Sequence, residues 1–267
     1  MPPSIRLVLA LCAAAAAARA HAHDTWVQVS APVVRPGDLV HVDLALGNHG
    51  NDHRDFKFAG KLRSLDGATL TVLAPDGRAT DLVPAAIDLG SAPTDGFWSA
   101  RHVPAVERLH CVAHTREGRH RDTRSIKSAK TYFVVAEDVT RPSAAARDLP
   151  APLGHALELV PETHPVLDAG PGRAIAVRLL FRGRPLADER VSFIPRGTEL
   201  AADFDPDFER RTDAEGRCTW TPKQGDRVLV VARRAAPEER GTDHEGTAYS
   251  ATLVIDVPQR RPCGTID

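Results

Sequence analysis

The sequence predicts an all-β protein, built as two Ig-like or Greek-key β-sandwich domains in tandem after a cleaved signal peptide. Short runs rich in Val and Leu alternate with turn residues, and the chain of 267 residues contains 21 Pro and 19 Gly. Aromatic residues make up only 5% of it, and there is one Met. About 245 residues remain after the leader, which is enough for two domains of ordinary size.

Residues 1–22 are the predicted signal peptide. Residues 1–6 carry one positive charge, an apolar run of Leu, Val, Ala and one Cys follows, and small-residue cleavage sites end at Ala20 and Ala22. Lipoprotein processing at Cys12 is the less favoured alternative, because a leucine precedes it where a small residue is needed. No run approaches the roughly 20 apolar residues that span a bilayer. We therefore expect a periplasmic or secreted protein without direct membrane insertion.

Residues 23–138 are expected to form the N-terminal β-sandwich, with about seven short strands. A Pro-Gly pair and a Pro-Asp-Gly triplet mark turns between extended segments. In the sequence RLHCVAHT, the alternation places His110 and His114 on one face of a strand and Cys111 on the other. The extended segments, in order, are 25–30, 39–46, 69–83 around the triplet, 108–115 and 128–137.

Residues 139–152 carry three prolines and show no period, so they are the predicted linker. Residues 153–259 are expected to form the C-terminal sandwich, in which an Asp-Ala-Glu-Gly turn joins two strands, and 260–267 form a tail. The extended segments of this second half fall within 155–167, 173–197, 210–234 and 248–258.

Charge and motif content exclude several classes of function. Lys and Arg number 34 against 35 Asp and Glu, so no basic excess favours nucleic acid or an anionic membrane. The sequence has no Gly-x-Ser-x-Gly elbow and no phosphate-binding glycine loop. Cys111, Cys218 and Cys263 follow the leader. This odd count allows at most one intrachain disulfide, whose partners stay open.

The clearest chemical signal lies at the two cleavage sites, where histidines become amino-terminal. Cleavage after Ala20 gives His21-Ala22-His23, whose amine, two backbone nitrogens and His23 imidazole form a square-planar set suited to Cu(II) or Ni(II). Cleavage after Ala22 makes His23 the first residue, and its amine and ring then chelate one ion as a brace that needs further ligands. A free amine has a pKa of about 7.7–8.0, so a metal displaces its proton near neutral pH. The alternative is that histidines at this junction are accidental.

The segment GNHGNDHRD, from Gly47, is the second candidate for metal ligation. It places His49 and His53 four residues apart, with Asp52 between them. In a turn, two imidazoles converge on one ion, and a carboxylate ligates or orients a ring. A solvated turn without metal is the alternative, because Asn, Gly and Asp form turns in any case.

Two further candidate ligands lie elsewhere in the chain. His110 and His114 are about 13 Å apart on one strand face at 3.3 Å per residue, so at most one of them joins a site. His244 stands between two acidic residues in a predicted loop. Spacing alone gives neither His110 nor His244 a partner.

Several stretches together resemble a known family. They are HAHDTWV, GNHGNDHRDFKFAGKL, SAKTYFVV, GHALELVPETHPV, FRGRPLADERVSF, TDAEGRCTW and HEGTAYSATL. They are similar to an exported family of unknown function that is associated with bacterial nickel and cobalt uptake. The last third also resembles transthyretin-like and carboxypeptidase-regulatory-like sandwiches. The resemblance implies a periplasmic metal-handling protein and defines no ligand residue by residue.

We therefore predict a non-enzymatic binding or delivery protein for nickel or cobalt, accessory to a membrane metal transporter. Copper is a further candidate, because nitrogen sites bind Cu(II) more tightly than Ni(II). The first alternative is a copper-dependent oxidative enzyme that uses an amino-terminal histidine brace, although three Trp and two Tyr offer little aromatic platform for a polysaccharide. The second is a metal-free protein-binding module of two sandwiches.

Overall fold

The computed structural model describes residues 23–47, 49, 64–90, 96–201 and 203–259, and within them confirms the all-β prediction. The strands are β1 (Asp24–Val29), β2 (Val33–Val34), β3 (Val40–Gly47), β4 (Ala68–Leu73), β5 (Ala79–Asp81), β6 (Ile87–Asp88), β7 (Trp98–His102), β8 (Arg108–His120), β9 (Thr123–Val135), β10 (Leu157–Pro161), β11 (Ile175–Phe181), β12 (Arg184–Pro185), β13 (Arg190–Pro195), β14 (Glu209–Arg211), β15 (Arg217–Trp220), β16 (Asp226–Ala236) and β17 (Gly246–Val257). Two short 3-10 helices accompany them, η1 (Val83–Ala85) and η2 (Ala144–Arg147). No helix in these ranges has the length and apolar character needed to cross a membrane.

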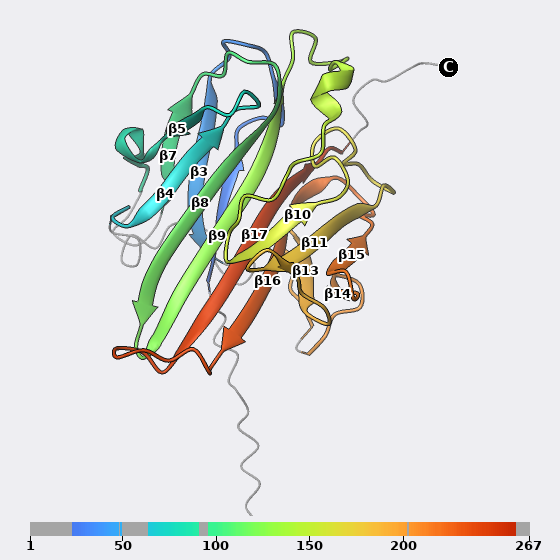
Figure 1. The fold of residues 1–267 in the computed structure, drawn as a ribbon. Helices are drawn as coiled ribbons and strands as arrows, with labels where there is room; N and C mark the ends of the chain where they lie inside the picture. Colours follow the sequence, from blue (N-terminus) through green and yellow to red (C-terminus); the bar gives the residue numbers. More distant parts are fainter. Residues whose placement is uncertain (1–22, 48, 50–63, 91–95, 202, 260–267) are drawn as a thin grey trace, which may run out of the picture.

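A long mixed sheet forms the middle of the molecule. Its strand order is β14-β13-β16-β17-β9-β8-β4-β5, and β2 also pairs with β9. The central pair, β9 and β17, is parallel, with the register running from Thr123 opposite Gly246 to Thr131 opposite Val254. Figure 1 shows β8, β9, β17 and β16 side by side along the length of this sheet.

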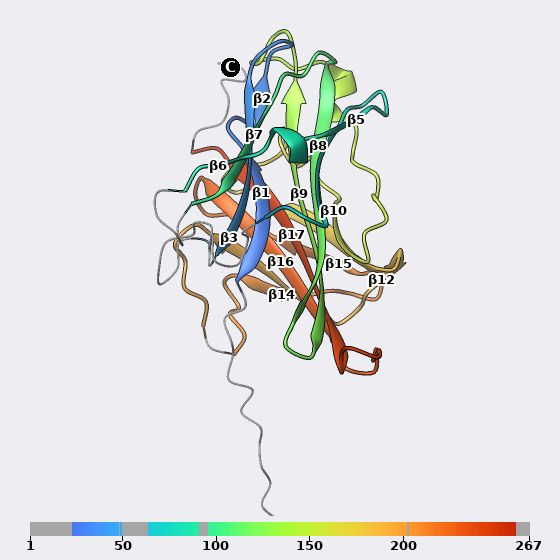
Figure 2. The same cartoon turned by 90° about the vertical axis from the view of Figure 1, so that its left-hand side faces the viewer.

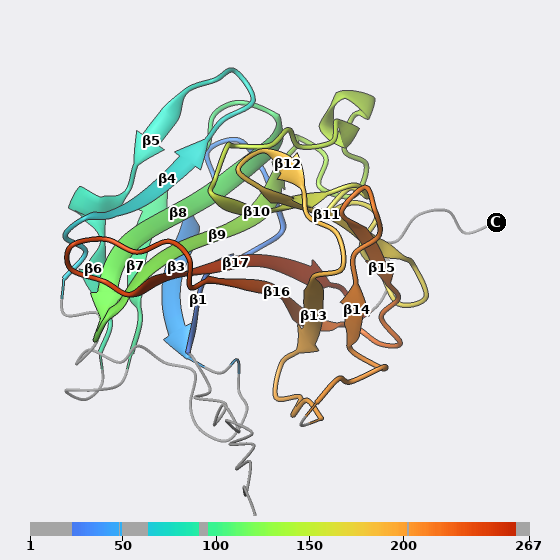
Figure 3. The same ribbon diagram turned by 60° about the horizontal axis from the view of Figure 1, so that its bottom comes forward.

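Two small sheets cover opposite faces of the central sheet. One has the order β1-β3-β7-β6, and the other contains β10, β11, β12 and β15. In β9, Phe133 belongs to the core beneath the first small sheet and Tyr132 to the core beneath the second. In β8, Val112 and Cys111 divide between the same two cores, as the predicted alternation requires. Figure 3 shows β10 and β11 on one side of β9, β17 and β16, and β1 and β3 on the other.

The sheet that begins with β1 also packs on strands from the far half of the chain. Trp26 of β1 and Ala45 of β3 share a third core with Leu229 and Val231 of β16 and Val254 of β17. Figure 2 shows β1 and β3 in front of the long strands in this region. The amino-terminal strand is therefore attached to both halves of the molecule.

The central sheet continues across the predicted domain boundary. β9 lies in the predicted N-terminal domain and β17 in the predicted C-terminal domain, yet the two strands are paired. Each predicted sandwich thus uses the same central sheet as one of its layers. The predicted linker 139–152 contains η2, in which Ala146 is 1% exposed. The boundaries at 139 and 152 stay predictions, and the shared sheet is a feature that the sequence analysis did not predict.

The predicted Asp-Ala-Glu-Gly turn joins β14 to β15. The backbone N–H of Gly216 donates to the carbonyl oxygen of Asp213 at 2.9 Å. Gly216 has a φ of +76°, and a Cβ there would lie 2.5 Å from the carbonyl oxygen of Leu179. Both the backbone conformation and the close approach of β11 therefore require glycine at this position.

A buried ion pair joins the central sheet to β10. Lys130 of β9 and Glu158 of β10 are 2% and 1% exposed, and Lys130 Nζ lies 2.7 Å from Glu158 Oε1. The carboxylate also accepts hydrogen bonds from the backbone N–H groups of Leu153, Gly154 and His155, at 2.6, 2.9 and 3.1 Å. A buried charge is tolerated when it is paired and its remaining lone pairs are satisfied, which is the arrangement around Glu158.

Candidate functional site

Charged side chains fix the start of β1 to the central sheet. Asp24 is 6% exposed and forms an ion pair with Arg233 of β16, whose Nε donates to Asp24 Oδ1 at 3.2 Å. Lys127 of β9 donates from Nζ to the carbonyl oxygen of His23 at 3.2 Å. His23 is the first described residue, and these contacts determine where it lies.

The imidazole of His49 is buried in the turn after β3. The residue is 1% exposed, has a φ of 56°, and its ring stands edge-on to Trp26 with 5.6 Å between the centroids. Burial lowers the pKa of His49 from 6.5 to about 3, with smaller contributions from the charges of Arg196 and Arg227. Neither ring nitrogen has a well-aligned hydrogen-bond partner within the described part of the chain. His49 is therefore a neutral imidazole whose lone pair is not used, at any pH near neutrality.

The pairing of β1 with β3 brings His23 and His49 to the same end of this strand pair. Asp24 lies opposite Gly47, so the chain enters β1 through His23 where it leaves β3 toward His49. The strand register thus brings the backbones of two predicted metal ligands to the same strand end. Sequence spacing gave no sign of this, because the two histidines are 26 positions apart in the chain.

His110 and His114 are placed in β8 as structural residues. His110 Nε2 lies 2.7 Å from the carbonyl oxygen of Val106, and its ring stacks on Phe133. His114 Nδ1 lies 2.6 Å from the carbonyl oxygen of Thr69. Each ring uses one nitrogen on a backbone carbonyl. Burial lowers the pKa of both, to about 4 for His114.

Of the remaining predicted ligands, only His244 lies within the described residues. His244 lies in the loop between β16 and β17, where its Nδ1 is 2.8 Å from Asp243 Oδ1. His21, Asp52 and His53 lie outside the described residues. Among the residues that are described, no group of three or more His, Cys, Asp or Glu side chains is arranged to hold a metal ion. Cys111 and Cys218 are both buried free thiols.

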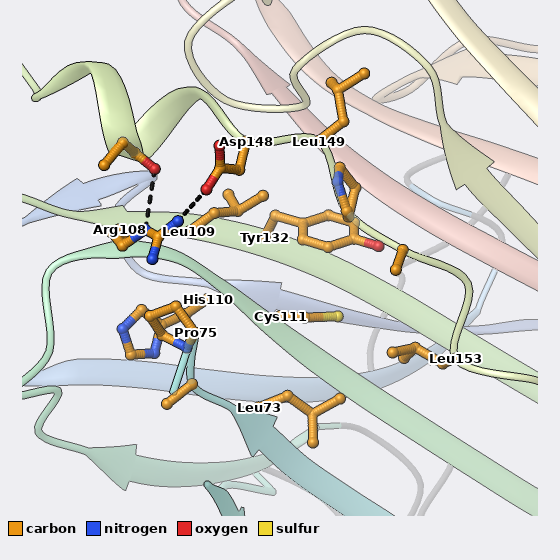
Figure 4. Close-up of a pocket in the computed structure, with 14 residues that line it drawn as sticks. Leu73, Pro75, Arg108, Leu109, His110, Cys111, Tyr132, Asp148, Leu149 and Leu153 are labelled. Atoms are coloured by element: carbon orange, nitrogen blue, oxygen red, sulfur yellow. Dashed lines mark hydrogen bonds and ion pairs between the residues drawn. The ribbon is translucent and has the colours of Figure 1, made fainter. Parts of the chain in front are cut away.

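A cavity of about 330 Å³, not predicted from the sequence, lies between β4, β8 and β9 on one side and residues 145–153 on the other. Figure 4 shows the ring of Tyr132 in the middle of its lining, with the Cys111 thiol near it and the Arg108–Asp148 ion pair at one edge. The only signal in the sequence was Tyr132 itself, one of two tyrosines, within an apolar strand. Residues 145–153 show no repeating pattern of apolar residues, so the sequence did not indicate that they line a cavity.

The fold and these sites define a class: a layered all-β protein with histidines at one strand end and a separate, largely apolar cavity. The family model described as Domain of unknown function (DUF4198) matches residues 20–236, so the chain belongs to that family. This confirms the unknown-function part of the resemblance seen in the sequence. The link to nickel and cobalt uptake and the transthyretin-like C-terminal part stay predictions.

No curated protein matches the chain. Among solved structures, the D0-D1 domain of intimin is 11% identical, with a TM-score of 0.23 and coverage of 88% of this chain and 98% of that one. A DUF4785 family protein from Legionella pneumophila is 9% identical, with a TM-score of 0.30 and coverage of 78% and 51%. A Salmonella alpha-2-macroglobulin mutant is 16% identical, with a TM-score of 0.27 and coverage of 89% and 15%. At such TM-scores these likenesses carry no argument about function.

Proposed function

We propose that this protein is a periplasmic binding or delivery protein that takes a transition metal ion at the end of β1 and β3 where His23 and His49 lie. The observation that carries the proposal is His49, a buried imidazole whose ring nitrogens have no well-aligned hydrogen-bond partner among the described residues, with only a weak interaction with the backbone of Ile194. Leaving a buried polar atom unsatisfied costs about 1–3 kcal/mol, and metal coordination removes part of that cost. Nickel or cobalt is the proposed cargo on family resemblance, with copper as the rival on ligand chemistry.

The protonation state of His49 suits a metal ligand. A ligating imidazole must be neutral, and a pKa of about 3 means that no proton competes for His49 near pH 7. The charges nearby oppose a cation, although Arg227 is itself paired with Asp256 at 2.8 Å. The free amine and ring of His23, after cleavage at Ala22, would supply two more nitrogen donors. Together these make a three-nitrogen set that leaves room for exchangeable ligands, as a delivery protein needs.

Delivery is favoured over oxidative catalysis by the position of the aromatic side chains. Four of the five Trp and Tyr residues are buried, with exposed fractions of 1–6%, so they form no surface platform for a polymer. These four are Trp26, Tyr132, Trp220 and Tyr249. The partner in this proposal is a membrane metal transporter, with no role for nucleic acid.

Calorimetric titration of the mature protein with Ni(II), Co(II) and Cu(II) tests the proposal. The sample is purified from its exported compartment, and its amino terminus is established by mass and sequencing. We expect one ion per chain, and an affinity lowered more than tenfold in His23→Ala and in His49→Phe. His120→Ala, at the exposed end of β8, is the matched control and leaves the affinity unchanged. Metal-free melting temperatures show whether each variant is folded.

The other outcomes separate the rival functions. Unchanged binding in both variants would move the site away from this end of the molecule. A protein that stays empty with every ion would favour the metal-free binding module. If the copper-loaded protein consumes oxygen together with a reductant, and His23→Ala abolishes this activity, the oxidative-enzyme alternative is favoured.

A further inference from the structure

The cavity beside β8, here called the latched pocket, is separate from the histidine end of β1. Its walls are β4, β8 and β9 and the segment 145–153, and its volume is about 330 Å³. Most of its lining is apolar, including Leu73 and Leu109 from the sheet and Leu149 and Leu153 from the segment. Small-molecule sites are mostly apolar concavities that begin near this size, with a few polar groups that set orientation.

Arg108 joins the sheet to the segment at the edge of the pocket and gives the latched pocket its name. Its Nε donates to the carbonyl oxygen of Ala145 at 3.1 Å, and its guanidinium pairs with Asp148. Arg108 has a φ of +106°, a backbone conformation that costs a residue other than glycine about 1–3 kcal/mol. Such strain persists where the surroundings hold it in place, and it concentrates at ligand clamps and other functional sites. The strained residue here is the one that closes the pocket.

Tyr132 provides the unexplained polar group of this pocket. The residue is 4% exposed, and its buried hydroxyl has no well-aligned oxygen or nitrogen partner within the described residues, its one polar neighbour being the Cys111 sulfur, a weak acceptor. The Cys111 thiol lies beside it, and the thiol itself is directed to the carbonyl oxygen of Val112 at 3.6 Å. A buried hydroxyl normally has a partner, because leaving it without one is costly. A ligand oxygen would be a stronger acceptor for this hydroxyl than the Cys111 sulfur.

The charged groups around the pocket are already paired. Arg108 and Asp148 bind each other at its edge, and Lys130 and Glu158, whose charges act on Tyr132 and Cys111, bind each other. A charged ligand would find no counter-ion there without breaking one of these pairs. The pocket therefore suits an uncharged molecule.

We propose that the latched pocket binds a small, uncharged, largely apolar molecule that carries one hydrogen-bond acceptor for the Tyr132 hydroxyl. This inference does not depend on the metal site, because the two sites share no residue. A carbonyl oxygen on a compact hydrocarbon frame is the chemistry that matches the lining. The acceptor is directed to the Tyr132 hydroxyl, and the hydrocarbon part contacts the leucines.

The test uses acetophenone as the probe and toluene as the matched probe without an acceptor. The chain has two tyrosines, so labelling them with ¹³C at the ring ε position gives two signals, one inside the pocket and one outside it. We expect the Tyr132 signal to shift saturably with acetophenone while the Tyr249 signal stays in place. Acetophenone should bind about fivefold more tightly than toluene, the factor that a typical net hydrogen bond provides.

Three variants of the full mature chain make the test decisive. Tyr132→Phe keeps the ring and removes the hydroxyl, so it folds normally and loses the preference for acetophenone over toluene. Tyr249→Phe is the matched control: its hydroxyl is bonded to Glu239 at 2.5 Å, away from the pocket, and the preference is kept. Leu73→Trp fills the pocket and abolishes the Tyr132 shift. Absence of a saturable shift, a preference retained in Tyr132→Phe, or an undiminished shift in folded Leu73→Trp would each overturn the proposal.

Discussion

Replacing Glu158 by glutamine perturbs the buried ion pair between β9 and β10. Lys130 Nζ lies 2.7 Å from Glu158 Oε1 and both side chains are at most 2% exposed, so the variant leaves a buried lysine without its counter-ion. Breaking such a pair by removing one partner typically costs about 3–5 kcal/mol, out of a total stability of about 5–15 kcal/mol. We therefore expect Glu158→Gln to lower the free energy of unfolding by about 3–5 kcal/mol.

Urea unfolding followed by tryptophan fluorescence measures this change. Lys130→Met should lower the free energy of unfolding less than Glu158→Gln does. The Glu158 carboxylate then loses its lysine but keeps the hydrogen bonds from three backbone N–H groups. The double variant should be more stable than the sum of the single effects predicts, by at least about 1 kcal/mol. Lys223→Met is the matched control, since Lys223 is 87% exposed and pairs with Asp207 only at 3.4 Å.

The pH dependence gives the same experiment a second readout. Burial alone would raise the pKa of Glu158, but the charge of Lys130 and the hydrogen bond from Leu153 hold it below its ordinary value of 4.5. A lowered folded-state pKa contributes stability that is present above the unfolded pKa and is lost as the pH falls through the folded one. The difference between wild type and Glu158→Gln should therefore shrink below pH 4.5. A Glu158→Gln protein within 1 kcal/mol of wild type at pH 7 would refute the reasoning.

Two further predictions concern buried groups on β8 and β15. Burial lowers the pKa of His114 to about 4, so stability falls as the pH drops below 6.5, where the unfolded chain takes up a proton. His114→Gln should flatten part of this slope in urea unfolding between pH 7 and 5, and an unchanged slope would contradict the assignment. Burial raises the pKa of Cys111 to about 11 and of Cys218 to about 12. In a Cys263→Ser chain, neither thiol should react with a disulfide reagent at pH 8 before urea is added, and prompt labelling of the folded chain would place a thiol at the surface.

Local features of the fold were predictable because they depend on neighbouring residues. The turn at Gly216 follows from Asp-Ala-Glu-Gly, and the alternation around Cys111 and Val112 in β8 follows from the period of two. The three-layer arrangement was not predictable in this way. β9 and β16 are buried on both faces over much of their length, so their sequences lack a clear polar and apolar alternation that would show which face belongs to which core.

Among the candidate sites too, local features were predictable from the sequence and long-range contacts were not. His23 was found from the sequence because cleavage chemistry is a local property, but its position at the same strand end as His49 depends on the register of β1 against β3. The latched pocket depends on Arg108 reaching Ala145 and Asp148, 37 and 40 positions later, in a segment without a period. A contact of that kind leaves no repeating pattern in the chain.

The shared central sheet also explains why the two predicted sandwiches cannot be treated as independent bodies. β9 pairs with β8 on one edge and with β17 on the other, so separating the halves would expose the backbone groups of β9 from Thr123 to Thr131. It would also uncover Tyr132 and its neighbours, which pack beneath β10 and β11. Unpaired strand edges and exposed cores are both strongly unfavourable. The segment between β9 and β10 therefore folds back onto the sheet and closes the latched pocket, a role that an open linker between separate domains would not have.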